Sequence, residues 1–307
     1  MSGRRVVVLG AGAVGGSIAA LLSAAGVPVK VVARGAHLAA IRSGGLRLRC
    51  PDGASTHRLD AAATVDEVDW RPGDLALLAT KLNDAEEVLD QLLQAAGPTV
   101  PVVCATNGLA AERWAGARFE TVLSMLVWLP ATHLVPGEIR LHSAPCRGVL
   151  DTGPAGELCD ALCSDLREAG FEAQPRDDIL HWKRAKLLTN LGGAAQALVA
   201  DDWLDVAQRA QSEGARIFER LGVEHVSVET LLERCASVRQ LPIDGQEREG
   251  GSTWQSFRRG KPLESIHLEG ELARIARDGG LDAPLNAALA AASEDPREAR
   301  AREFPSG

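Results

Sequence analysis

The chain has 307 residues, with 33 lysines and arginines against 41 aspartates and glutamates, so its formal net charge at neutral pH is −8. An acidic chain without basic runs is poorly suited to bind nucleic acid or an anionic membrane. Hydrophobic residues make up 46%, which is typical of a globular protein and argues against wholesale disorder. No apolar run approaches the roughly 20 residues that cross a bilayer. The length favours two domains.

Six cysteines are scattered along the sequence without the close spacing of a zinc site. We therefore expect no bound metal, and we expect reduced thiols, as in a cytoplasmic protein. The N-terminus supports the cytoplasmic expectation, because its apolar run from Val6 to Leu9 ends at Gly10 and is too short for a secretory leader.

The first half of the chain alternates short apolar runs with segments of helical periodicity. Four runs that are apolar on both faces predict strands: 6–9, 29–33, 75–79 and 100–105. Helical segments over 14–25 and 85–95 separate them, so we expect an α/β fold with a parallel sheet covered on both sides. Turn residues between 121 and 151 predict further strands that close the same sheet.

The pattern changes near residue 178, where alanine- and leucine-rich helical segments take over. One helical segment is expected to run from 178 to 200. We place the domain boundary at 175, with an α/β domain over 1–175 and an all-helical domain over 176–307. The residues from Glu294 onward are charged and contain proline, which predicts a loosely held tail.

Glycines recur at a specific spacing directly after the first predicted strand. Gly10, Gly12 and Gly15 form a GxGxxG arrangement that leads into the first predicted helix. The first glycine makes the turn, the second lets backbone amides approach a pyrophosphate, and the third permits close packing of helix and strand. This spacing alone is weak, but the flanking strand and helix supply the required context. The sequence therefore predicts a dinucleotide site.

The residue after the second predicted strand indicates which dinucleotide is bound. NAD-binding sites of this type place an aspartate or glutamate there to hold the ribose 2′-hydroxyl, whereas this chain has Arg34. A guanidinium suits a 2′-phosphate, so we expect NADP as the cofactor. The alternative is that Arg34 is a loop residue that contacts only solvent.

A lysine and an asparagine share one side of the helical segment at 178–200. Lys186 and Asn190 are four residues apart, so they project in the same direction. Their neighbours are mostly apolar, which predicts a central helix. Desolvation would lower the pKa of a lysine in such a place and suit it to act as a general acid. The residues alone are equally compatible with a lysine that reaches water over its apolar stem.

Four further polar residues stand at strand ends or helix starts. Lys81 and Asn107 follow predicted strands, where the carboxyl ends of a parallel sheet present loops to a ligand. Asn107 precedes a glycine and would be explained equally by a turn. Ser252 and Glu264 lie at predicted helix starts, and helix initiation explains both adequately.

Taken in order, these residues resemble the ketopantoate reductase family. The resemblance extends to about residue 290 and depends on the ordered set: GAGAVG from Gly10, Arg34, Thr80-Lys81, Asn107-Gly108, the Lys-x-x-x-Asn of Lys186 and Asn190, and Ser252 twelve residues before Glu264. It implies a Rossmann NADP-binding domain over 1–175 and an all-helical substrate and catalytic domain over 176–307. It also implies NADPH-dependent reduction of a 2-keto acid, 2-dehydropantoate or a related ketone, and a place in pantothenate biosynthesis.

The resemblance also implies roles for individual residues. Lys186 matches the catalytic lysine, which polarises the ketone and protonates the forming alkoxide, and Glu264 matches the acidic residue that engages the substrate. Lys81 and Asn107 match residues that contact the cofactor, and Asn190 and Ser252 match residues that contact the substrate. A small keto acid is the implied partner, and a monomer or a homodimer both remain open.

Two positions depart from the family pattern. Ala194 stands where members often carry a second asparagine, and Ser256 stands where an aspartate is expected. Loss of a polar group from a substrate wall weakens the case for 2-dehydropantoate itself and favours a related ketone. Two other functions stay open: an enzyme of the β-hydroxyacid dehydrogenase and imine reductase group, and a non-catalytic NADP-binding regulator.

Overall fold

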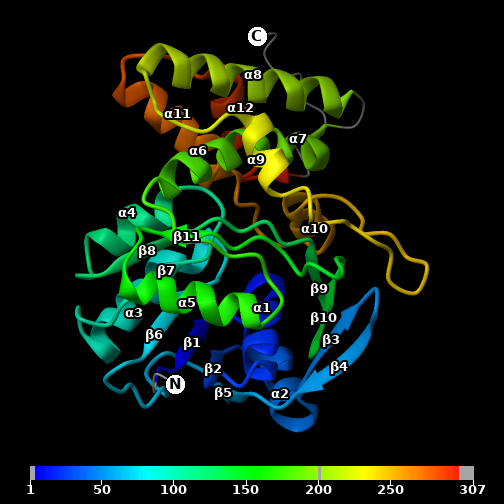
Figure 1. Ribbon diagram of the computed structural model, residues 1–307. Coiled ribbons are helices and arrows are strands. Elements are labelled where there is room, and N and C mark those ends of the chain that lie inside the picture. Colours follow the sequence, from blue (N-terminus) through cyan, green and yellow to red (C-terminus); the bar gives the residue numbers. More distant parts are fainter. Residues whose placement is uncertain (1–3, 200–201, 297–307) are drawn as a thin grey trace. The chain divides into compact units, whose positions relative to one another are not determined.

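The structure, a computed structural model, describes residues 4–199 and 202–296, so most of the tail expected from Glu294 lies outside the described residues. The described chain forms two compact units (Figure 1). Unit 1 contains 4–106, 111–179 and 232–248, and unit 2 contains the remaining described residues. The helical half of the sequence therefore contributes one segment, 232–248, to the α/β unit.

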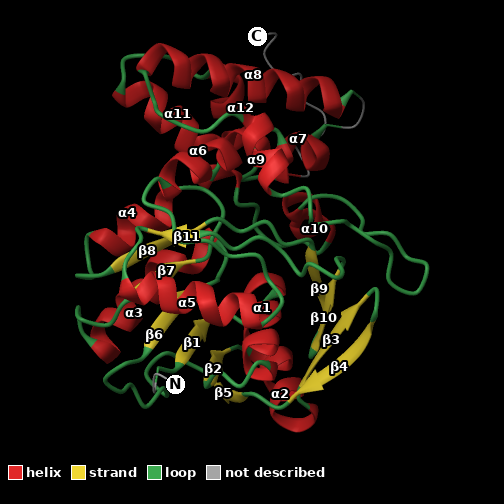
Figure 2. Ribbon diagram, viewed as in Figure 1, coloured by secondary structure: helices red, strands yellow, loops and turns green. Residues whose placement is uncertain are grey.

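Unit 1 is built on a parallel sheet, which confirms the α/β prediction. In the described part of the chain its strands follow the order β11-β8-β7-β6-β1-β2-β5 (Figure 2). All neighbours are parallel except β11, which is antiparallel to β8. The strands are β1 (Val6–Leu9), β2 (Val29–Val32), β5 (Asp60–Ala62), β6 (Leu75–Leu78), β7 (Val102–Cys104), β8 (Val122–Met125) and β11 (Thr152–Gly153). Strand order reverses at β1, where an α/β sheet of this kind binds its ligand.

The prediction that all strands between 121 and 151 close this sheet is wrong. Strands β9 (Ala131–Val135) and β10 (Glu138–Leu141) instead join β3 (Leu46–Cys50) and β4 (Gly53–His57) in a second sheet of order β4-β3-β10-β9. Strand β10 pairs in parallel with β3, its partner far away in the sequence. The hydrophobic pattern identifies a strand, but a partner this distant leaves no local signal.

Helix α1 (Ala13–Ala24) packs against β1 and β2 of the first sheet and against β9 and β10 of the second (Figure 1). A Cβ on Gly16 would come within 2.1 Å of Ile139 Cδ1 and within 2.9 Å of the backbone oxygen of Ala11, so there is little room for a side chain where the second sheet approaches the helix. The other helices in this part of the chain are α2 (Gly35–Gly44), α3 (Leu82–Ala96), α4 (Ala110–Gly116) and α5 (Glu157–Glu168).

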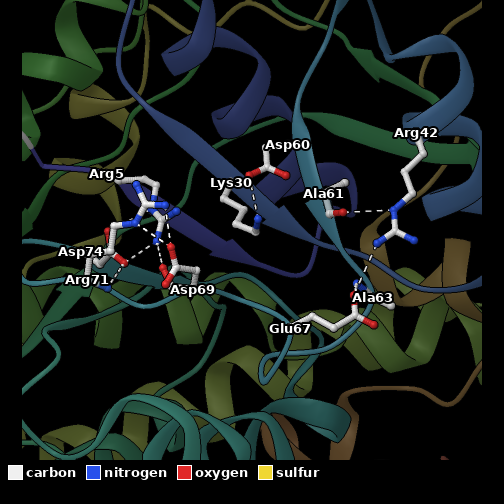
Figure 3. A network of polar contacts seen from close by, with 10 residues as sticks. All are labelled: Arg5, Lys30, Arg42, Asp60, Ala61, Ala63, Glu67, Asp69, Arg71 and Asp74. Carbon is white, nitrogen blue, oxygen red and sulfur yellow. Dashed lines mark hydrogen bonds and ion pairs between the residues drawn. The ribbon is translucent and has the colours of Figure 1, made fainter.

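Ion pairs join the segments at the amino ends of the parallel strands (Figure 3). Arg5, just before β1, lies 2.6 Å from Asp74, just before β6. Lys30 in β2 lies 2.7 Å from Asp60 in β5. These contacts stabilise the edge opposite to the one at which the glycine turn follows β1.

Unit 2 is helical in its described residues, as predicted. Its helices are α6 (Ile179–Asn190), α7 (Gly193–Leu198), α8 (Trp203–Leu221), α9 (Val228–Arg234, which continues into unit 1), α10 (Ser252–Arg258), the 3-10 turn η1 (Ser265–His267), α11 (Glu269–Asp278) and α12 (Pro284–Ala292). Small apolar residues of α7 pack with α8 and α12 in a buried cluster that includes Ala194, Ala210 and Leu289.

The single helix expected over 178–200 is broken in two, which corrects that prediction. Gly192 adopts φ of +80° between α6 and α7, a conformation that favours glycine. A Cβ at this position would also come within 2.4 Å of Ala207 Cα. Asn190 is therefore the last residue of α6, beside the break.

No disulfide joins any of the six cysteines, all of which lie in the described part of the chain. Among the described residues, no helix combines the length and apolar character that a membrane span needs.

A buried carboxylate attaches the 232–248 segment to the rest of unit 1. Asp151 is fully buried and accepts hydrogen bonds from Arg176 Nε at 2.6 Å and from Arg234 Nη2 at 2.7 Å. Arg234 also forms an ion pair with Glu172. The carboxylate therefore holds two arginines that are themselves largely buried.

We expect Asp151→Asn to lower the free energy of unfolding by about 3 kcal/mol, because removal of one partner leaves buried guanidinium groups uncompensated. The control is Asp60→Asn, which removes the Lys30 ion pair of a 63% exposed carboxylate and should cost less than about 1 kcal/mol. Urea denaturation of both variants measures the difference. Equal losses would show that Asp151 does not carry this attachment.

Candidate functional site

The glycine turn forms an open, positively polarised end of α1. Gly12 is the N-cap residue of this helix, whose first turn contains no acidic residue. The first amides of a helix have no partners within the helix, and they attract an anion. A Cβ on Gly12 would meet no atom within 4 Å, so the space beside it is free for a ligand.

The two flanking glycines are required by close packing. Gly10 has φ of +99°, and a Cβ there would come within 2.9 Å of Thr80 N. A Cβ on Gly15 would lie 2.2 Å from the carbonyl oxygen of Gly10 and 2.8 Å from Ala79 Cβ. The turn after β1 thus packs against the segment after β6. The exposed first amides of α1 beside Gly12 are suited to bind a pyrophosphate.

A histidine that the sequence analysis did not select holds this turn in place. His37 Nε2 lies 2.7 Å from the carbonyl oxygen of Ala11, and the amide of Gly137 donates to Nδ1 at 2.9 Å. Because an amide can only donate, Nδ1 is the acceptor and Nε2 carries the proton. Burial lowers the pKa of His37, which favours this neutral form. A single histidine gives no sequence pattern from which this role could be found.

Arg34 and Lys81 follow the two strands that flank β1. Arg34 is the N-cap residue of α2 and is 71% exposed, and its Nη2 lies 2.8 Å from Asp84 Oδ2. Lys81 is the N-cap residue of α3 and is half-buried. Since β2, β1 and β6 are parallel neighbours, both residues lie at the same edge of the sheet as the glycine turn.

Asn107 and the remaining predicted site residues belong to unit 2. Asn107 stands three residues after β7, and Gly108 has φ of +75°, a backbone conformation that favours glycine. Lys186 and Asn190 lie one turn apart on α6; half of the residues of this helix are buried, and these two side chains are half-buried. Asn190 Nδ2 is buried without a hydrogen-bond partner, so a donor is available for an oxygen that the protein does not supply.

Two of the segments that carry these residues meet beside the break between α6 and α7. A Cβ on Gly193 would lie 3.4 Å from Thr253 Oγ1, so the start of α10, where Ser252 is the first residue, lies against α7. Glu264 is buried and immediately precedes η1. The two departures from the family pattern are also buried, Ala194 completely and Ser256 with its hydroxyl donating to the Ser252 carbonyl at 3.2 Å.

Glu269 is a second acidic residue of this region that the sequence analysis missed. Its fully buried carboxylate accepts the amide hydrogen bond of Ala194 at 3.2 Å, so it supports the first turn of α7. Burial raises the pKa of Glu269 to about 7, although the Ala194 amide acts in the opposite direction. The position of Glu269 at a helix start gave no indication of this burial.

Comparison with known proteins identifies the family. Residues 6–155 match the family described as ketopantoate reductase PanE/ApbA, and residues 179–295 match its C-terminal part. A 2-dehydropantoate 2-reductase from Mesorhizobium japonicum is 29% identical over 89% of this chain and 91% of its own length. One from Pyrococcus horikoshii is 25% identical over 92% of this chain and 94% of its own length.

Solved structures show the same fold. A PanE/ApbA family ketopantoate reductase from Ralstonia eutropha JMP134 has a TM-score of 0.79 at 23% identity, covering 97% of this chain and all of its own. The ternary structure of D-mandelate dehydrogenase with NADH and anilino(oxo)acetate has a TM-score of 0.79 at 19% identity, covering 96% and 99%.

The fold and the glycine turn are those of a dinucleotide-binding protein, and the family matches place the chain among the NAD(P)-dependent 2-keto acid reductases. The chain belongs to the ketopantoate reductase PanE/ApbA family, since the family matches cover most of its length. That family uses NADH or NADPH as hydride donor, so the resemblance found in the sequence is confirmed at the level of the family.

We predict that Gly12→Asp weakens NADPH binding at least about tenfold, because it places a carboxylate beside the pyrophosphate position. Aspartate is a favourable N-cap residue and Gly12 has open space around it, so the fold should be retained. Gly12→Asn, equal in size but uncharged, is the control in a fluorescence titration. Equal effects of the two variants would contradict an anion site at this helix end.

Glu269 gives a prediction about pH. Its pKa is raised from an ordinary value of 4.5 to about 7 in the folded protein, so folding favours the protonated carboxyl. The associated stability is present below about pH 4.5 and is lost as the pH rises to about 7. Glu269→Gln mimics the protonated form at every pH. Relative to this variant, the wild type should lose on the order of 1–3 kcal/mol of unfolding free energy over that interval.

Urea denaturation of both proteins at pH 5 and pH 8 measures that change, and titration of all other groups cancels in the comparison. A difference between wild type and Glu269→Gln that does not vary with pH would show that Glu269 ionises normally.

Proposed function

We propose that this protein uses NADPH to reduce a 2-keto acid to the corresponding 2-hydroxy acid. The proposal is carried by the unpartnered buried amide nitrogen of Asn190, one turn along α6 from Lys186. This nitrogen is a hydrogen-bond donor without an acceptor in the protein. A substrate with a carbonyl and a carboxylate supplies such oxygens. Family membership and the glycine turn support the choice of a dinucleotide as the second reactant.

In this proposal residues from the N-terminal part of the chain, 1–175, bind the cofactor. The amides beside Gly12 hold the pyrophosphate, Gly10 and Gly15 allow the close approach of the chain, and Arg34 binds the 2′-phosphate. Lys81 and Asn107 complete the cofactor contacts, and residues 1–175 form the cofactor domain. NADPH is favoured over NADH because of Arg34.

The residues of the helical domain, 176–307, act on the substrate. The bound dinucleotide supplies the hydride to the carbonyl carbon. Lys186 donates a hydrogen bond to the carbonyl oxygen, stabilises the negative charge that develops there and transfers the proton. Asn190 and Ser252 hold the substrate oxygens, and Glu264 engages the substrate from the segment before η1.

The substrate is 2-dehydropantoate or a related 2-keto acid. Curated relatives are 2-dehydropantoate 2-reductases, whereas a structural relative is a D-mandelate dehydrogenase. Ala194 and Ser256 replace larger polar residues expected at the substrate site, so fewer polar groups could recognise a substrate hydroxyl. The loss of these groups favours a related ketone as the substrate. A role in pantothenate biosynthesis follows only if 2-dehydropantoate is the substrate.

We expect Lys186→Met to lower the rate of NADPH-dependent keto acid reduction by about 10²–10⁴-fold, because it removes the proton donor and a positive charge. NADPH affinity should stay within about twofold, since the pyrophosphate and ribose contacts are unchanged. Stopped-flow measurement of single turnover and a binding titration give the two quantities.

Lys261→Met is the matched control, because this exposed lysine lies between Ser252 and Glu264 in the sequence. Its activity should equal that of the wild type. Full activity of Lys186→Met would remove the lysine from the reaction. If the wild-type protein binds NADPH but reduces no 2-keto acid, the protein would instead be a non-catalytic NADP-binding regulator.

A further inference from the structure

The exposed arginine expected to choose the cofactor is already engaged by a carboxylate. Arg34 Nη2 and Asp84 Oδ2 are 2.8 Å apart, and the two side chains are 71% and 45% exposed. Arg34 follows β2, and Asp84 is the third residue of α3, which follows β6. Both strands are direct neighbours of β1, so this ion pair lies at the edge of the sheet where the glycine turn begins.

An ion pair this exposed is weak and can be exchanged for another partner. A ribose 2′-phosphate carries close to two negative charges near neutral pH and can accept two parallel hydrogen bonds from a guanidinium. A phosphate that binds through Nη2 displaces Asp84 from Arg34, and the carboxylate that remains nearby repels it. A ribose 2′-hydroxyl is uncharged and meets no such repulsion; a carboxylate can even accept its hydrogen bond.

We propose that Asp84 is a specificity-determining residue, which competes with the 2′-phosphate for Arg34 and so reduces the preference of this site for NADP(H) over NAD(H). The inference rests on the proposed function only in taking the glycine turn as a dinucleotide site. The cofactor preference of the protein is then set by two opposed charges, one at the start of α2 and one in the first turn of α3.

A purely structural role for the pair makes a different prediction. Asp84 also lies in the first turn of α3, where a carboxylate interacts favourably with the helix dipole. If the pair only joins α2 to α3, its loss alters the site for every adenine nucleotide by the same factor. Selectivity between two nucleotides that differ only in the 2′-phosphate therefore separates the two roles.

The test is calorimetric titration with 2′,5′-ADP and 5′-AMP, which differ by the 2′-phosphate and lack the nicotinamide, so no catalysis is involved. Asp84→Asn keeps the size of the side chain and removes its charge. We expect about three- to fivefold tighter binding of 2′,5′-ADP and no tightening for 5′-AMP.

The matched control is Asp60→Asn, which removes the charge of an exposed carboxylate paired with Lys30 at the opposite edge of the sheet (Figure 3). A β2 strand of about four residues separates that edge from Arg34 by roughly one Debye length, so we expect neither nucleotide to change.

Three results would overturn the proposal: no tightening of 2′,5′-ADP by Asp84→Asn, equal changes for both nucleotides, or the same selectivity change in Asp60→Asn. If neither nucleotide binds the wild type, the dinucleotide site fails and this inference fails with it. If the selectivity change is found but no 2-keto acid is reduced, only the proposed reaction fails.

Discussion

The turn from β1 into α1 brings backbone segments so close together that only glycines fit between them. A Cβ on Gly15 would overlap the carbonyl oxygen of Gly10, and a Cβ on Gly10 would press on the backbone of Thr80. This packing directs the first turn of α1 toward the carboxyl edge of the sheet, where the loops after β2 and β6 also begin. The Ala11 carbonyl that His37 holds belongs to the same turn, so the glycines determine where the whole anion site lies.

The helical unit has an analogous dependence on Gly192. Because this glycine breaks the helix, Asn190 is at the end of α6 and the amide of Ala194 is available to the buried carboxylate of Glu269. A second asparagine at 194 would have to fit in a position that is completely buried here. The Ser256 hydroxyl is also buried and donates a hydrogen bond within its own helix, so both departures from the family pattern lie in the packed interior of the helical unit.

Local sequence patterns correctly predicted the strands and helix starts that are determined by neighbouring residues. The strands at Val6–Leu9 and Leu75–Leu78 were found because they are apolar on both faces, and α10 was found from its start at Ser252. The patterns failed where a contact with a residue far away in the sequence determines the strand pairing or the end of a helix. Strand β10 is paired by β3, and the break at Gly192 reflects the approach of Ala207. His37, Asp84 and Glu269 are ordinary polar residues in the sequence, and only their partners reveal what they do.

NADPH-dependent reduction of a 2-keto acid is the activity on which all of the proposed residue roles depend. The most direct measurement is the oxidation of NADPH by the purified protein with 2-dehydropantoate and a panel of branched and aromatic 2-keto acids, with NADH as the comparison. We expect rapid oxidation with at least one of these acids and none without an acid. Tight NADPH binding with no oxidation in the presence of any 2-keto acid would contradict this expectation.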